Sequence, residues 1–280
     1  MEIKSRFWYM LAPLEDMTDT SFRTLCHKYG ADLTFTELVR FESLAKNNKP
    51  SWQRITLTDE TPTVILLIGA KEYFLKKFLK MFEPQKGFQG FDLNLGCPAP
   101  NFVNNGTGAA MIKRINHTRT LVNIMRDNGY FTSIKMRLGL NQYEKKKKAY
   151  LNLINAVNAD YFIVHARHGK NTYHDKADWS VFPECVKTGK AIIANGDIKT
   201  KEDVEKLKEM GLAGAMIGRA AIKNPGIFSE FKGLPIPDMA KLREEYLKIV
   251  KERNSPLRYR ENIKKYMGSG EEFEEERGKY

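Results

Sequence analysis

The sequence of 280 residues predicts an α/β fold in which eight parallel strands close into a barrel with alternating helices, a (β/α)8 barrel. Short apolar runs alternate with longer helical segments about eight times in roughly 230 residues. The runs are largely apolar, as expected for parallel strands that are buried on both faces. The first run continues into APLEDMTD, which has no glycine. An open doubly wound sheet, the competing architecture, normally has a glycine-rich phosphate loop there, so the barrel is favoured.

The elements follow from these patterns. Strands are expected at 7–13, 32–38, 62–68, 90–96, 132–138, 159–166, 190–196 and 213–218. Helices are expected at 21–30, 71–82, 118–129, 143–158 and 201–211. Several of these end in Gly or Asn, as helix C-termini prefer. Thr118 and Thr200 are predicted helix starts because a threonine hydroxyl can cap free backbone N–H groups.

A proline-containing linker at 234–238 separates two predicted domains. The first is a catalytic barrel at 1–233, and the second is a short helical extension at 238–280 that is first basic and then acidic. The stretch MAKLREEYLKIVKERN predicts an amphipathic helix, and SPLRYRENIKKYMG predicts a second, basic one. The final EEFEEERGKY has no apolar periodicity and is expected to be solvated.

Composition limits the class of partner and compartment. The net charge of +12 and the pI of about 9.4 favour a polyanion, with nucleic acid ahead of an acidic membrane, although simple solubility also explains such a charge. No apolar run approaches the ~20 residues that span a bilayer, and the start lacks the features of a signal peptide. The three cysteines form no metal-type pair, so we expect no metal and a reducing, cytoplasmic setting.

Candidate functional residues lie at the carboxyl ends of the predicted strands, where barrels of this kind carry their chemistry. They are Glu37, Asn94, Cys97, Lys135, Arg137, His165 with the following Arg167 and His168, Asn195, Gly196, Asp197, Gly218 and Arg219. A lone strand-end Asn is usually a turn residue, and a lone Cys is usually a small buried filler. A lysine inside a barrel strand is harder to dismiss, because burying an unpaired ammonium is costly. Convergence of six polar strand ends predicts one active site.

The residue types at this site favour a flavin. A reduced flavin is anionic near N1 and O2, and a lysine such as Lys135 can stabilise that charge. The loops after the last two strands expose backbone N–H groups at Gly196 and Gly218, where barrels commonly bind a phosphate. Together these residues favour FMN.

The chain contains, in this order, APLEDMTDTSFR, TELV, DLNLGCPAP, IKMRLG, VHARHG, YHDKADW, IANGDI and GAMIGRAAIKNP. As a set these motifs resemble the dihydrouridine synthase family over residues 12–228. The resemblance implies a TIM-barrel flavoenzyme that reduces the C5–C6 double bond of uridine in RNA, with tRNA the favoured substrate. It implies NADPH as the reductant of FMN, hydride transfer from reduced FMN to C6, and protonation of C5 by Cys97. We expect the protein to be a monomer.

The resemblance also implies roles for single residues. Cys97 would be the catalytic acid. The cofactor would contact Ala12, Pro13, Leu14, Lys135, His165, Asn195, Gly196, Asp197, Gly218 and Arg219. The substrate would contact Asn94, Arg137 and Tyr173.

Several positions depart from the family pattern. Leu66 stands where the family has a glutamine that touches the flavin, and Asn101 and Asn104 stand where it has lysines near the RNA. HARTR is replaced by HARHG, and the extension is shorter than the family's usual helical RNA-binding domain, so we expect at most a reduced RNA-binding region.

Two other functions stay open. One is an FMN barrel oxidoreductase for a free pyrimidine, similar to dihydroorotate dehydrogenase, against which the positive charge argues. The other is a non-catalytic RNA-binding relative, against which the joint presence of Cys97, Lys135 and His165 argues.

Overall fold

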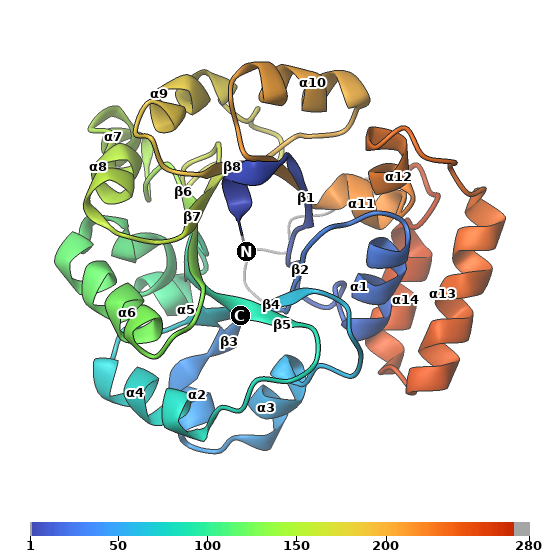
Figure 1. The fold of residues 1–280 in the computed structure, drawn as a ribbon, viewed down its shortest axis with the longest axis horizontal. Coiled ribbons are helices and arrows are strands. Elements are labelled where there is room, and N and C mark those ends of the chain that lie inside the picture. Colours follow the sequence, from blue (N-terminus) through green and yellow to red (C-terminus); the bar gives the residue numbers. More distant parts are fainter. Residues whose placement is uncertain (1, 272–280) are drawn as a thin grey trace.

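A computed structural model describes residues 2–271 of the chain. All strands in this range belong to one parallel sheet, in the order β1-β9-β8-β7-β6-β5-β4-β2, with β3 also paired to β4. Their bounds are β1 Trp8–Leu11, β2 Thr34–Phe35, β3 Val39–Arg40, β4 Thr63–Ile68, β5 Phe88–Leu95, β6 Thr132–Arg137, β7 Tyr161–His165, β8 Ile192–Asn195 and β9 Gly214–Ile217. Met10 bridges Leu33 in parallel, which brings β1 beside β2 and closes the ring. The predicted barrel is confirmed (Figure 1).

Helices surround the strands (Figure 1). The α-helices are α1 Thr20–Lys28, α2 Phe41–Ala45, α3 Lys49–Ile55, α4 Glu72–Met81, α5 Pro100–Val103, α6 Ile115–Asp127, α7 Gln142–Lys146, α8 Ala149–Ala156, α9 Phe182–Val186, α10 Lys201–Glu209, α11 Arg219–Lys223, α12 Ile227–Phe231, α13 Met239–Arg253 and α14 Leu257–Tyr266. Short 3-10 helices lie at η1 Ile3–Ser5, η2 Gly108–Lys113 and η3 Trp179–Val181. None of these helices is both long and apolar enough to cross a membrane.

Two apolar clusters hold the barrel together. The larger one lies between the strands and the surrounding helices, and the smaller one fills the barrel with side chains such as Met10, Phe35, Val64, Ile163 and Met216. Successive strand residues point to opposite faces, so alternate positions belong to the interior. This interior floor is apolar, and the polar residues of the same strand faces lie above it, toward the carboxyl ends.

The structure differs locally from the sequence prediction. The strand expected at 32–38 is shortened to β2, because the hydroxyl of Thr36 accepts the N–H of Leu66 (3.0 Å) where a strand would offer a carbonyl. The short strand β3 follows outside the expected range. The helix expected at 143–158 is split into α7 and α8 at Lys148, whose φ is +53°.

The two predicted helix starts have different outcomes. Thr200 does cap α10, and its hydroxyl accepts the N–H of Asp203. Thr118 as a helix start is wrong, because α6 begins three residues earlier at Ile115 and buries the Thr118 side chain. Helix α6 therefore begins before the threonine that the sequence suggested as its cap.

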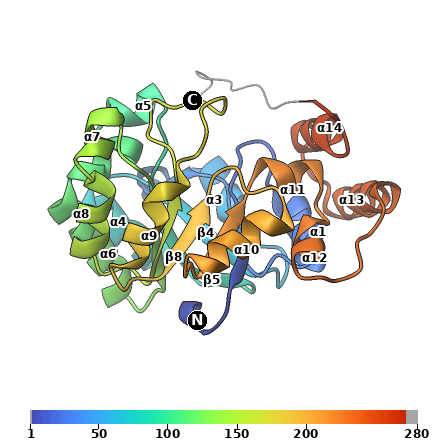
Figure 2. The same cartoon turned by 90° about the horizontal axis from the view of Figure 1, so that it is seen from above.

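The chain after 234–238 returns to the barrel. In α13, the Tyr246 ring packs edge-on against Phe22 of α1, with centroids 6.2 Å apart. Helix α14 lies on the same side of the barrel as α5, opposite the N-terminus (Figure 2). Both expected helices are present, whereas 272–280, most of the stretch expected to be a solvated tail, lie outside the described residues.

Candidate active site

The loop that carries Cys97 is braced from two sides. The side-chain oxygen of Asn94, at the end of β5, accepts hydrogen bonds from the backbone N–H groups of Gly96 (3.1 Å) and Cys97 (2.9 Å). The N–H of Ala109 donates to the Cys97 carbonyl (2.9 Å). Gly108 has φ +59°, and a Cβ there would lie 2.5 Å from that carbonyl oxygen. The close approach of η2 to the cysteine loop therefore requires glycine at this position.

Cys97 is the one partly exposed cysteine; Cys26 and Cys185 are buried. Burial raises the pKa of the Cys97 thiol, and the nearby cations of Arg137 and Lys135 oppose this rise only in part. A thiol with a raised pKa is protonated at neutral pH. Cys97 is therefore suited to give a proton rather than to attack as a thiolate.

Lys135 extends from β6 into the barrel above the apolar floor. Its ammonium donates to the side-chain oxygen of Asn195 at the end of β8 (3.1 Å). That amide is oriented because its nitrogen donates to the carbonyl of Met216 in β9 (2.8 Å). Burial and then the charge of Arg137 lower the pKa of Lys135 to about 8. Within residues 2–271 the ammonium makes only this hydrogen bond, so its other N–H donors can serve an anionic ligand.

Asp92 lies below this lysine and was missed in the sequence analysis. Its carboxylate is fully buried and accepts hydrogen bonds from the Ser133 hydroxyl (2.5 Å) and from the backbone N–H of Lys135 (3.1 Å). Burial raises its pKa to about 7. Its signal in the sequence was the spacing in DLN, which places Asp92 and Asn94 on the same inward face of β5.

His165, at the end of β7, faces the same opening of the barrel. Burial, and then the charges of Arg137 and Lys135, lower its pKa well below the ordinary value. Arg137 itself donates to the backbone carbonyls of His168 (3.0 Å) and Asn171 (3.3 Å), which ties β6 to the loop after β7.

Arg167 and Asp197 link the last strand ends. The sequence placed Arg167 after a predicted strand but gave it no role in the site. Asp197, with φ +57°, accepts from Arg167 (2.6 Å) and from Arg219 (2.9 Å). The guanidinium of Arg219 in turn lies 4.2 Å from the ring centre of Tyr173. Asp197 and Tyr173 thus hold Arg219 in place beside the strand ends.

Ala12, Leu14 and Gly218 form the neighbouring wall. A Cβ built on Gly218 would lie 3.5 Å from the Ala12 Cβ and 3.7 Å from the Leu14 Cδ1. Pro13, between them, is partly buried. The segment after β1 therefore lies against the loop after β9.

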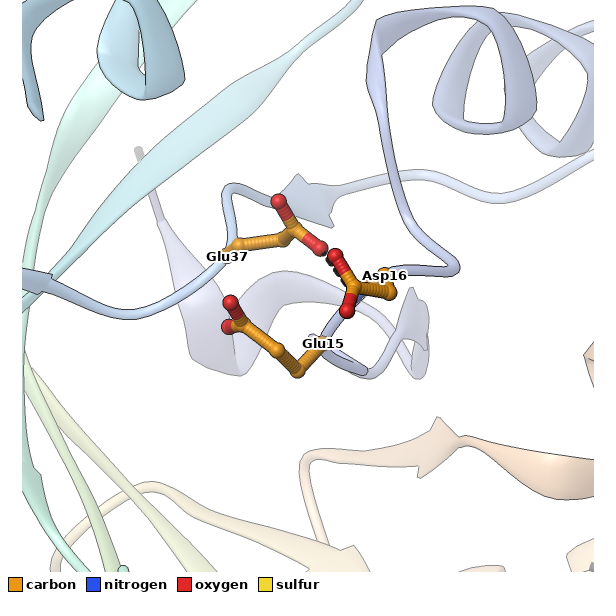
Figure 3. A group of neighbouring side chains, drawn as sticks. All are labelled: Glu15, Asp16 and Glu37. Carbon is orange, nitrogen blue, oxygen red and sulfur yellow. Dashed lines mark hydrogen bonds between the residues drawn. The ribbon is translucent and has the colours of Figure 1, made fainter. Parts of the chain in front are cut away.

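An acidic rim is formed by Glu15 and Asp16, in the segment after β1, and by Glu37, in the segment after β2 (Figure 3). Ligand oxygens of the three carboxylates lie within 4.8 Å of one another, an arrangement that could hold a cation. Burial, followed by the charge of Glu15, raises the pKa of Glu37 to about 7.

Each carboxylate of the acidic rim already has a protein partner. Arg54 pairs with Glu15, Arg258 with Asp16 (3.0 Å), and the Tyr259 hydroxyl donates to Glu37. Two of these partners come from α14, so the rim connects the C-terminal helix to the barrel.

The structure brings the predicted residues together at the carboxyl ends of the strands. We call this opening of the barrel the mouth, and its residues include Cys97, Lys135, His165, Asn195 and Arg219. The thiol of Cys97 and the ammonium of Lys135 are close enough to affect each other's pKa. Leu66 is buried in β4, in register with Asp92. Asn101 and Asn104 lie at α5, beyond the cysteine loop.

The protein is a closed parallel barrel that carries a braced thiol and a buried ammonium at the carboxyl ends of its strands. This fold and this site are those of a barrel enzyme. The family model described as dihydrouridine synthase matches residues 10–271, and the chain belongs to that family, whose members are oxidoreductases. A "Probable tRNA-dihydrouridine synthase" of Helicobacter pylori (strain ATCC 700392 / 26695) is 35% identical over 239 residues, 83% of this chain and 72% of that protein. The "Probable tRNA-dihydrouridine synthase 2" of Bacillus subtilis (strain 168) is 34% identical over 237 residues, 80% of this chain and 72% of that protein.

Proposed function

We propose that this protein reduces uridine to 5,6-dihydrouridine in RNA, with tRNA as the substrate, FMN as the cofactor and NADPH as the reductant. The observation that carries the proposal is the placement of Cys97 and Lys135 at one mouth, near enough to influence each other's charge. Family membership and the names of its relatives supply the reaction class.

The residues at the mouth fit FMN. Lys135 has N–H donors to spare for the electron-rich edge of a flavin, and Ala12 and Leu14 offer an apolar wall for its ring. The backbone N–H groups of Gly196 and Gly218, at the ends of β8 and β9, would bind the phosphate, with Asn195 and Arg219 beside them. When bound, FMN would accept a hydride from NADPH and pass it to C6 of the uracil.

Asp197 would serve the cofactor indirectly. Its carboxylate carries the same sign of charge as a phosphate, and both of its oxygens are occupied by Arg167 and Arg219. Asp197 therefore orients Arg219 toward the phosphate rather than contacting it.

The thiol of Cys97 donates the proton to C5. Its raised pKa keeps it protonated at neutral pH, and the Asn94 and Ala109 contacts hold it in place. The side-chain oxygen of Asn94 is taken by two N–H groups, so only its amide nitrogen remains to bind the uracil, together with Arg137. The uridine must leave its stack to reach these groups.

The RNA would lie across the mouth, bordered by Tyr173 and α14. Two basic residues of the C-terminal part, Arg253 and Arg258, are already paired with Asp59 and Asp16. Exposed Lys248 and Lys251 of α13 remain available for phosphates. The C-terminal helices would thus form a reduced RNA-binding surface on a cytoplasmic, monomeric enzyme.

Three measurements test the proposal. The purified protein should show a flavin spectrum, and RNA from cells lacking the gene should lose dihydrouridine at defined positions. Cys97→Ala should retain flavin and lose activity on RNA by about 10²–10⁴-fold, the usual contribution of a general acid. An unchanged dihydrouridine map would overturn the proposal. Turnover of a free pyrimidine without RNA, or RNA binding without flavin, would replace it with one of the two alternative functions.

A further inference from the structure

All three nitrogens of the Arg167 guanidinium have a hydrogen-bond partner inside the protein. Its side chain is 1% exposed. Nε donates to the carbonyl of Asp175 (2.7 Å), Nη2 to Asp197 (2.6 Å), and Nη1 lies 3.2 Å from Nε2 of His165.

The chemistry of a guanidinium decides the direction of the last contact. Arginine carries only N–H donors and stays protonated in proteins, so Nε2 of His165 must accept the hydrogen bond. A ring nitrogen that accepts carries no proton, and a neutral imidazole then carries its proton on the other nitrogen. We propose that Arg167 is a positioning residue that fixes His165 as the neutral tautomer with its proton on Nδ1.

The surroundings of His165 agree with a neutral ring. The cations that face it come from β6 (Lys135 and Arg137), from the loop after β7 (Arg167) and from α11 (Arg219), and with burial they lower its pKa. The nearby carboxylate, Asp197, is paired with two of these arginines.

Close packing keeps the ring in this orientation. A Cβ built on Gly196 would lie 2.9 Å from Cδ2 and 3.3 Å from Nε2 of His165, so the backbone after β8 touches this edge of the ring. The opposite nitrogen, Nδ1, has no hydrogen-bond partner within residues 2–271. Its N–H can therefore donate to a ligand in the mouth.

The consequence is that His165 recognises acceptors and does not take up a proton. A carbonyl oxygen suits it, and both a flavin and a uracil carry such oxygens. Naming these two as the ligands rests on the proposed function, whereas the tautomer does not.

The test is a ¹⁵N NMR spectrum of the protein labelled in its histidines, with the His165 signals assigned by their loss in His165→Gln. The expected result is Nδ1 in the protonated range and Nε2 in the unprotonated range at neutral pH. A proton on Nε2, a doubly protonated ring, or exchange between tautomers in the wild-type protein would overturn the proposal. The tautomer is read from the wild-type spectrum, so this test does not depend on the folding of the Arg167 variant.

The role of Arg167 itself is tested by Arg167→Met. We expect loss of the single Nδ1–H signature and population of both tautomers, with the signals of the other histidines unchanged. Arg126→Met is the matched control, because Arg126 also pairs with a carboxylate, Asp160, but at the opposite end of the barrel; its His165 signals should match the wild type. A folded Arg167→Met protein that keeps the wild-type tautomer would overturn the assignment to Arg167. Failure of the proposed function would appear in the dihydrouridine map and would leave these spectra as they are.

Discussion

Replacing Gly108 with alanine should displace Cys97, the proposed proton donor. The φ of +59° costs an L-residue about 1–2 kcal/mol. The new Cβ would lie 2.5 Å from the Cys97 carbonyl oxygen, a backbone atom that cannot rotate away. Relief requires the loop to shift and weakens the hydrogen bond from Ala109, which contributes about 1 kcal/mol. The expected loss in the free energy of unfolding is therefore about 2–3 kcal/mol, measured by urea denaturation.

Activity should fall further than stability alone explains. A misplacement of about 1 Å at a reacting group can cost about 10²-fold in rate, so Gly108→Ala should lower single-turnover dihydrouridine formation by about that factor. Gly129→Ala is the matched control: its φ is +82°, but no atom lies within 4 Å of the new Cβ. It should lose only the backbone contribution of about 1–2 kcal/mol and keep its activity. Equal losses of stability in both variants, with activity unchanged in both, would refute the reasoning about the cysteine loop.

Two further predictions follow from buried charges. The folded-state pKa of Glu37 is raised to about 7 from 4.5, so the native protein holds this proton more tightly and loses stability as the pH rises from about 4.5 to 7. In Glu37→Gln the free energy of unfolding, measured with urea, should fall by about 3 kcal/mol less between pH 4.5 and 7 than in the wild type. The same dependence on pH in both proteins would contradict the raised pKa of Glu37. Lys135→Met removes a desolvated ammonium, so its melting temperature without flavin should be no lower than that of the wild type. Its affinity for FMN should fall by about 10–100-fold in a flavin fluorescence titration, and undiminished affinity would exclude Lys135 from the cofactor site.

Much of the mouth could be predicted because its residues follow strands with a clear local signature. Apolar runs bounded by Gly, Pro and Asn mark the strand ends, and Cys97, Lys135 and His165 stand at or just beyond them. The errors arose where tertiary contacts overrode local pattern. The hydroxyl of Thr36 interrupts one expected strand, and a left-handed Lys148 interrupts one expected helix.

Asp92 was missed, and Arg167 was named only by its place after a strand, because the roles of both depend on contacts that no local pattern contains. Asp92 reads as an ordinary polar residue in a strand until the barrel closes around it. Arg167 follows His165 by two positions, but its bond to Asp197 spans 30 residues. Such partners are brought together by the order of the strands.

By itself the sequence determined the alternation of strands and helices, and with it the end of the barrel at which the reactive side chains gather. Hydrophobic period and turn residues are local properties, so they can be read along the chain. Only the tertiary structure decided the charge and direction of those side chains. Asn195 reaches Lys135 across 60 residues, and Tyr259 of α14 reaches Glu37 across 222. The pKa of each group and the direction of its hydrogen bonds depend on burial and on such distant partners. Both are present only once the barrel is closed.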